Sequence, residues 1–150
     1  MSNLKKELYT LCVNYAKNRI DTAKLAIEDA KQSANEETKS SAGDKYETAR
    51  EMMQQETDRN QAQLNEANKL LVALNQINVD TVSTTAVPGS LVVTDNGKFY
   101  IAISAGALTL NGEGYFAVSP ASPIGGKLQG RKVGDQFSLN GKDYQVKGVI

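Results

Sequence analysis

The side chains in this sequence that could carry out chemistry are carboxylates, amines and hydroxyls. Its 150 residues include 17 Asp or Glu, 17 Lys or Arg, one cysteine and no histidine. Because Ser-His-Asp and Cys-His catalysis both need an imidazole as general base, enzymes of those classes are excluded. A zinc site of the usual kind is excluded as well, since it draws on histidines or several cysteines. We therefore expect a protein that is not an enzyme.

Charged residues that could contact a ligand gather on both sides of a short break at residues 40–43. They are Glu36, Glu37, Lys39, Asp44, Lys45 and Glu47. Asp44 is the best candidate for a projecting carboxylate, although the same residue type is favoured as the N-cap of a helix. The two glutamates before the break are more typical of a solvated helix face. The two lysines could contact phosphates or a partner's aspartates, or remain solvated.

Charge and hydropathy restrict the partners and the compartment. The formal net charge is zero, which argues against a broad nucleic-acid-binding protein. Cys12 lies in an apolar stretch, so we expect it to be buried, and a single cysteine allows no internal disulfide. The longest apolar run, Leu70 to Leu74, is far too short to span a membrane. We expect a soluble cytoplasmic protein, a monomer or weak oligomer, that binds neither a membrane nor a specific nucleic-acid sequence.

The elements that must position these side chains differ between the two halves of the chain. Residues 1–79 contain one glycine and no proline, whereas residues 80–150 contain the other 11 glycines and all three prolines. Because glycine and proline interrupt regular structure, the first half should form long helices and the second short strands and turns. We predict two domains with these boundaries.

Apolar residues of the first half recur at steps of three and four residues, as in a coiled-coil seam. The apolar stripe begins with Leu4, Leu8, Leu11 and Tyr15 and continues, shifted by one residue, with Ala16, Ile20, Ala23, Ile27, Ala30 and Ala34. Gly43 lowers helix propensity by about 1 kcal/mol, and Ser40 and Ser41 are natural cap or turn residues. We predict an antiparallel coiled-coil hairpin; the alternative is one continuous helix in an intermolecular coiled coil.

The second half alternates short apolar runs with turn sequences. Asp95-Asn96-Gly97 and Asn140-Gly141 are turn signals between such runs, and Ser122-Pro123 is typical of a helix N-terminus. The sequence thus predicts an α+β chain in which the hairpin precedes a small β-rich domain. Its expected core consists of Val92, Ile101, Phe116, Leu128, Val133, Phe137 and Val146.

Two segments resemble the Gre family of bacterial transcript-cleavage and elongation factors. Residues 122–135 read Ser-Pro-Ile-Gly-Gly-Lys-Leu-Gln-Gly-Arg-Lys-Val-Gly-Asp, similar to the family's S-P-I/L-A/G-x-x-L-x-G-K/R-x-x-G-D. Residues 45–51 read Lys-Tyr-Glu-Thr-Ala-Arg-Glu, similar to the family's E-Y-x-A-A-R/K-E at the start of the second arm. The resemblance implies that the β-rich domain is FKBP-like and that the partner is RNA polymerase.

The resemblance also implies a mode of action. Gre factors lodge in the secondary channel of RNA polymerase, with the globular domain at the rim and the hairpin reaching inward. Acidic residues at the tip help to hold a second Mg²⁺, which promotes hydrolysis of backtracked RNA. On this model the chain has no cofactor of its own, and Asp44 would share a Mg²⁺ with the polymerase. The surface that docks on polymerase would include Ser122, Pro123, Ile124 and Lys127, which could equally serve as a helix start that packs on the core.

The tip departs from the family pattern D-x-x-E-N-A. Counting back from Tyr46, Lys39 stands at the Asp position and Ala42 at the Glu position, and neither can ligate Mg²⁺. The tip therefore favours binding in the channel over stimulation of cleavage.

Two other functions compete with this interpretation. One is an adaptor whose hairpin binds a different protein or a second copy of the chain. The other is a peptidyl-prolyl isomerase-like enzyme whose peptide pocket is lined by aromatic residues that otherwise form strand core. Those residues are Phe99, Tyr100, Tyr115, Phe116 and Tyr144.

Overall fold

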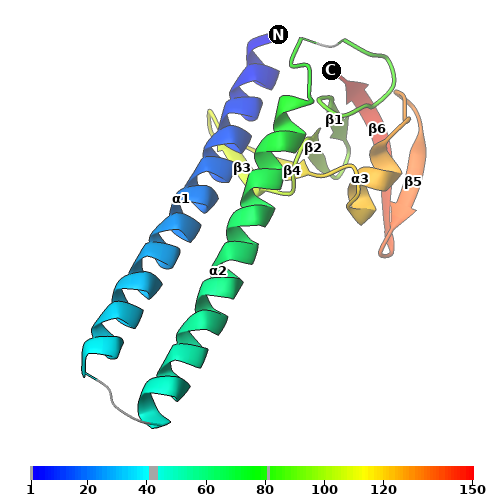
Figure 1. The fold of residues 1–150 in the computed structure, drawn as a ribbon. Helices are drawn as coiled ribbons and strands as arrows, with labels where there is room; N and C mark the ends of the chain where they lie inside the picture. The colour runs from blue at the N-terminus through cyan, green and yellow to red at the C-terminus, as the bar shows by residue number, and fades with distance from the viewer. Residues whose placement is uncertain (1, 41–43, 81) are drawn as a thin grey trace. The chain divides into compact units, whose positions relative to one another are not determined.

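Two long helices come first in the chain and a six-stranded mixed sheet follows, so the fold class is α+β, as predicted (Figure 1). In this computed structural model the backbone is described for residues 2–40, 44–80 and 82–150, and the side chains for residues 3–33, 48, 50–80 and 82–150.

The predicted helical hairpin is present. Helix α1 spans Ser2–Ser40 and helix α2 spans Asp44–Asn75, so α1 ends and α2 begins at the expected break. Within residues 16–71 the two helices lie side by side and run in opposite directions (Figure 1). Ala23 and Ala30 of the apolar stripe are buried, because small side chains allow two helices to approach closely. No helix in the described part of the chain has both the length and the apolar character that crossing a membrane requires.

In the described residues that follow the hairpin, the structure has six strands and one short helix. They are β1 Leu91–Thr94, β2 Gly97–Ile101, β3 Gly106–Leu110, β4 Glu113–Val118, α3 Pro123–Leu128, β5 Gln136–Leu139 and β6 Lys142–Val149. The strand order across the sheet is β3-β4-β2-β1-β6-β5. Strands β2 and β4 are parallel, and the other neighbours are antiparallel. The predicted turns at residues 95–96 and 140–141 connect β1 to β2 and β5 to β6, whereas the sequence did not predict β3.

One face of the sheet carries the core that α3 covers. Its buried members are Ala86, Val92, Phe99, Ile101, Leu128, Phe137 and Val146. Five of the seven predicted core residues are therefore confirmed, and the predictions for Phe116 and Val133 are wrong. Phe116 lies one strand from the sheet edge and is 46% exposed, while Val133 lies in the loop between α3 and β5 and is 63% exposed.

The chain divides into two compact units that do not follow the change in composition at residue 79. Met1–Tyr15 and Val72–Ile150 form one unit, and Ala16–Leu71 forms the other. In the first unit the Tyr9 hydroxyl donates to the Leu74 carbonyl at 2.9 Å, which ties the start of α1 to the end of α2. Cys12 is fully buried there, as predicted. The sheet thus shares its unit with the two helix ends that form the base of the hairpin.

Tyr100 of β2 presents an uncompensated polar atom in the same unit. Its side chain is completely buried, and among the described residues its hydroxyl has no hydrogen-bond partner. Burial of a hydroxyl without a partner costs about 1–3 kcal/mol. We therefore expect Tyr100→Phe to leave the free energy of unfolding unchanged or to raise it by about 1 kcal/mol in urea titrations. A loss of more than about 1 kcal/mol would contradict this account of the hydroxyl.

Candidate functional site

The charged tip residues lie at the two helix ends that flank the break. The backbone of Glu36, Glu37 and Lys39 belongs to the last turns of α1, and that of Asp44, Lys45 and Glu47 to the first turn of α2. All six side chains lie outside the described residues, so their contacts and the Mg²⁺ role of Asp44 stay predictions. Among the side chains that are described, no cluster of three or more acidic or cysteine groups could hold a metal ion.

The Ser-Pro pair of the resembling segment starts α3, as expected. The Ser122 hydroxyl accepts a hydrogen bond from the Gly125 N–H at 3.1 Å and donates to the Ser119 carbonyl at 2.7 Å. Pro123 occupies the first turn, where its missing N–H costs no helical hydrogen bond and its fixed φ suits the helix. The capping serine and the proline together fix where α3 begins and how it leaves the preceding loop.

The four predicted docking residues divide between a structural role and an accessible one. Ser122 is committed to the cap, and Ile124 packs against the core cluster. Pro123 and Lys127 are exposed. A protein partner that approaches α3 would therefore touch the proline ring and the ammonium group, while the other two residues hold the helix in place. Docking itself stays a prediction.

The loop after α3 keeps basic groups close to Lys127. The Arg131 Nε donates to the Lys127 carbonyl at 2.8 Å, and its guanidinium lies 5.4 Å from the centroid of the Phe137 ring. Gly130 and Gly134 adopt φ of 78° and 94°, a region that favours glycine. Lys132 in the same loop is exposed, and its backbone N–H donates to the Asp135 Oδ2 at 2.9 Å, so the loop carries both basic and acidic groups.

The aromatic residues of the isomerase hypothesis do not line one pocket. Phe99 stacks on Phe116 at 5.8 Å and meets Tyr144 edge-on at 6.1 Å, so these three share the face that α3 covers. Tyr100 and Tyr115 are adjacent to Phe99 and Phe116 along their strands and therefore point to the opposite face. An enclosed peptide pocket built from all five is thus not formed.

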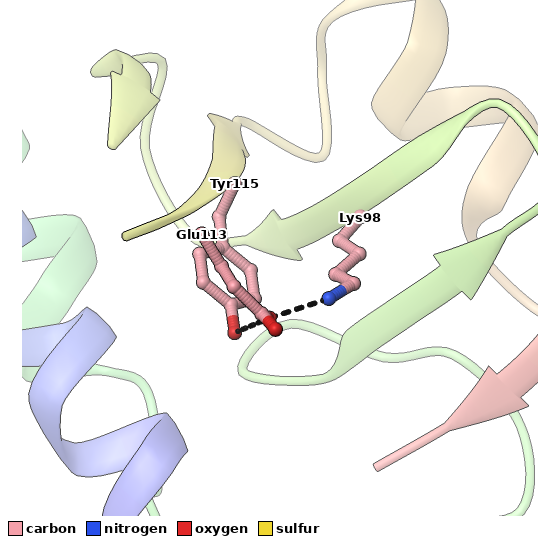
Figure 2. Close-up of polar contacts among 3 residues, drawn as sticks. All are labelled: Lys98, Glu113 and Tyr115. Atoms are coloured by element: carbon pink, nitrogen blue, oxygen red, sulfur yellow. Dashed lines mark hydrogen bonds and ion pairs between the residues drawn. The ribbon is translucent and has the colours of Figure 1, made fainter. Parts of the chain in front are cut away.

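The opposite face carries a polar cluster that was not expected from the sequence (Figure 2). The Lys98 Nζ of β2 lies 2.6 Å from the Glu113 Oε2 of β4, and the Tyr115 hydroxyl donates to the same oxygen at 3.1 Å. Lys98 Nζ also lies 5.2 Å from the centroid of the Tyr115 ring. The parallel register of β2 and β4, with Phe99 opposite Phe116, places Lys98 opposite Tyr115.

Electrostatics in this cluster favour the charged pair and the neutral phenol. The hydrogen bond from Lys98 lowers the pKa of Glu113, and the same contact raises the pKa of Lys98. Burial, followed by the nearby Glu113, raises the pKa of Tyr115. Because Lys98 and Glu113 are well exposed, their ion pair contributes little to stability. The cluster links the side chains of β2 and β4 and offers no free nucleophile or general base.

Comparison with known proteins gives a distant likeness to a solved structure. No protein-family model matches the chain, and no curated protein sequence matches it. A solved structure of the transcription factor Gfh1 superposes with a TM-score of 0.34 and 19% sequence identity, over 89% of this chain and 90% of that one. A likeness of this size does not establish a family.

Proposed function

We propose that this chain is a Gre-like factor that binds RNA polymerase at the secondary channel and modulates elongation or transcript cleavage. The hairpin would enter the channel, and the surface around α3 would dock at its rim. The chain would act in the cytoplasm as a non-enzymatic partner of the polymerase, with no cofactor of its own.

The observation that carries the proposal is the local structure of residues 122–135. This Gre-like segment forms a capped helix whose buried side anchors it to the sheet, while Pro123 and Lys127 remain exposed for a partner. It occurs in the same chain as a long helical hairpin, the element needed to reach into a channel. One segment therefore provides both the resemblance and an accessible surface.

The residues at the tip of the hairpin would determine whether the chain stimulates transcript cleavage or only modulates elongation. A shared Mg²⁺ would supply an activated water and neutralise phosphate charge in the polymerase active site, and this chain would contribute a carboxylate oxygen of Asp44. Lys39 and Ala42 replace the acidic residues of the family pattern, which favours modulation of elongation over strong stimulation of cleavage.

Polymerase binding is tested with a charge reversal on α3. We expect Lys127→Glu to weaken the affinity for purified bacterial RNA polymerase about tenfold, because the exposed ammonium group on the proposed docking surface would be replaced by a carboxylate. Lys142→Glu is the matched control: it makes the same charge change at an exposed lysine of the β5–β6 hairpin and should leave the affinity unchanged.

Elongation complexes provide the second readout. Transcript cleavage and elongation rate would be measured in backtracked complexes with the wild-type chain and with Asp44→Asn. Cleavage that rises with the wild type and is lost in the variant assigns the carboxylate to Mg²⁺. No measurable binding to polymerase and no change in either rate would refute the proposed function and leave the adaptor interpretation.

A further inference from the structure

Strand β3 is an edge of the sheet that no other element of the described chain pairs with on its outer side. The strand order begins with β3, whose one partner in the sheet is β4. At the opposite edge, β5 has β6 as its one partner in the sheet, and α3 contacts β5 on the core face. Among the described residues, β3 is therefore one of two strands whose outer side carries no partner strand.

The hairpin geometry shows which backbone groups of β3 face outward. Asn111 and Gly112 form a two-residue turn with φ of 52° and 80°, the pattern of a type I′ hairpin. In such a hairpin the flanking pair, Leu110 and Glu113, exchanges both hydrogen bonds, and this arrangement alternates along the ladder. Ala107 and Thr109 consequently direct their N–H and C=O groups away from β4.

The composition of this edge lacks the usual protection against pairing. Natural edge strands carry lysine, proline or a bulge that prevents another strand from adding. Residues 104–112, Ser-Ala-Gly-Ala-Leu-Thr-Leu-Asn-Gly, contain no charge and no proline. Ala107 and Thr109 are exposed, and the register of β3 with β4 shows no irregularity.

We infer that β3 is a self-association edge, on which β3 of a second copy of this chain adds as an antiparallel strand. Ala107 and Thr109 lie one residue on either side of Leu108. A two-fold axis beside Leu108 therefore places Ala107 opposite Thr109 of the second copy, and Thr109 opposite Ala107 of that copy. Four backbone hydrogen bonds follow, because both hydrogen-bonded pairs exchange two. The occupant is a second copy because the outward groups are self-complementary and the strands bring no like charges together.

The small contact area sets the strength of the pairing. One added strand with its neighbouring side chains buries less surface than a stable obligate dimer needs. The dimer should therefore dissociate with a Kd on the order of 100 μM, visible only in concentrated solution. This inference does not depend on the proposed function.

Engineered cysteines test the register directly. Across the two-fold axis Leu108 faces its own copy as a non-hydrogen-bonded pair, with Cα atoms about 4.5 Å apart, which is within disulfide range. We expect Leu108→Cys to form a covalent dimer under mild oxidation at high concentration. Leu110→Cys is the matched control on the same face, since its two copies would lie about 14 Å apart at 3.4 Å per residue. The native Cys12 is buried and does not compete.

Sedimentation of reduced protein provides the second measurement. Thr109→Pro removes an outward N–H and leaves the β3–β4 hydrogen bonds in place, so the Kd should rise at least tenfold. Thr109→Val keeps that N–H and should associate like the wild type. Cross-linking at position 108 but not at 110, together with loss of association in the proline variant alone, supports the inference. Cross-linking at both positions or at neither, or equal association of the two Thr109 variants, overturns it.

Discussion

Replacing Gly125 with alanine is expected to lower the free energy of unfolding of the sheet unit by about 3 kcal/mol or more, because an added methyl group has no space. A Cβ atom built on Gly125 would lie 1.9 Å from the Ser119 carbonyl oxygen and 2.9 Å from the Ser122 hydroxyl oxygen. Both neighbours belong to the loop and cap that start α3. The backbone of that loop must move, and the Ser122 cap is weakened with it.

The adjacent glycine provides the control. At Gly126 the nearest heavy atom to an added Cβ is the Pro120 carbonyl oxygen, at 3.9 Å, an ordinary van der Waals separation. Gly126→Ala should raise the free energy of unfolding by about 0.5–1 kcal/mol, since alanine favours the helix more than glycine does. Urea titrations of both variants check the pair. Equal effects at the two positions would contradict the close approach of α3 to the Ser119 carbonyl.

The second large effect is a loss of stability in alkaline solution that originates at Cys12. Burial raises the pKa of this thiol from 9.0 to about 12. A raised pKa means that the folded state favours the protonated thiol. The contribution of this thiol to the free energy of unfolding is therefore complete below pH 9, decreases above pH 9 and is lost as the pH rises through 12. Between pH 9 and 11 the wild type should lose about 2 kcal/mol more than Cys12→Ala.

Chemical denaturation at several pH values, with a reductant present, measures this difference. The alanine variant should be less stable than the wild type at pH 7 by about 1 kcal/mol, because it leaves a small cavity. Tyr100 and Tyr115 also have raised pKa values, mainly because of burial, and both chains retain them. The alkaline effect of Tyr115 therefore cancels in the comparison, whereas Cys12 also contributes to the raised pKa of Tyr100, so the measured difference includes that coupling. If the free energies of unfolding of the two chains fall in parallel from pH 9 to 11, Cys12 is not the origin of the alkaline loss of stability.

The helical hairpin and the start of α3 could be predicted because local chemistry determines them. A run with one glycine and no proline over 79 residues leaves helix as the favoured conformation, and the Ser122-Pro123 pair has both preferences of a helix N-terminus. The turn at Asn140-Gly141 is equally local: both residues adopt positive φ, which asparagine and glycine tolerate best.

Strand β3 and the Lys98–Glu113 pair could not be predicted from the same signals. Residues 106–110 lack the alternation of β-branched residues that is typical of a strand. They form a strand because they pair with β4. The ion pair depends on the parallel register of β2 and β4, which are not consecutive in the chain. The exposure of Phe116 has the same cause, since its face of the sheet is set by a partner strand distant in sequence.

The shared unit of Met1–Tyr15 and Val72–Ile150 has a consequence for synthesis on the ribosome. The start of α1 leaves the exit tunnel long before its packing partners after residue 72 exist. Ile150 is also needed, because the Leu91 and Ile150 backbones hydrogen-bond to each other in both directions, at 3.1 and 2.9 Å. Helices α1 and α2 can pair earlier, but the base that holds them is completed only after Ile150 has left the tunnel.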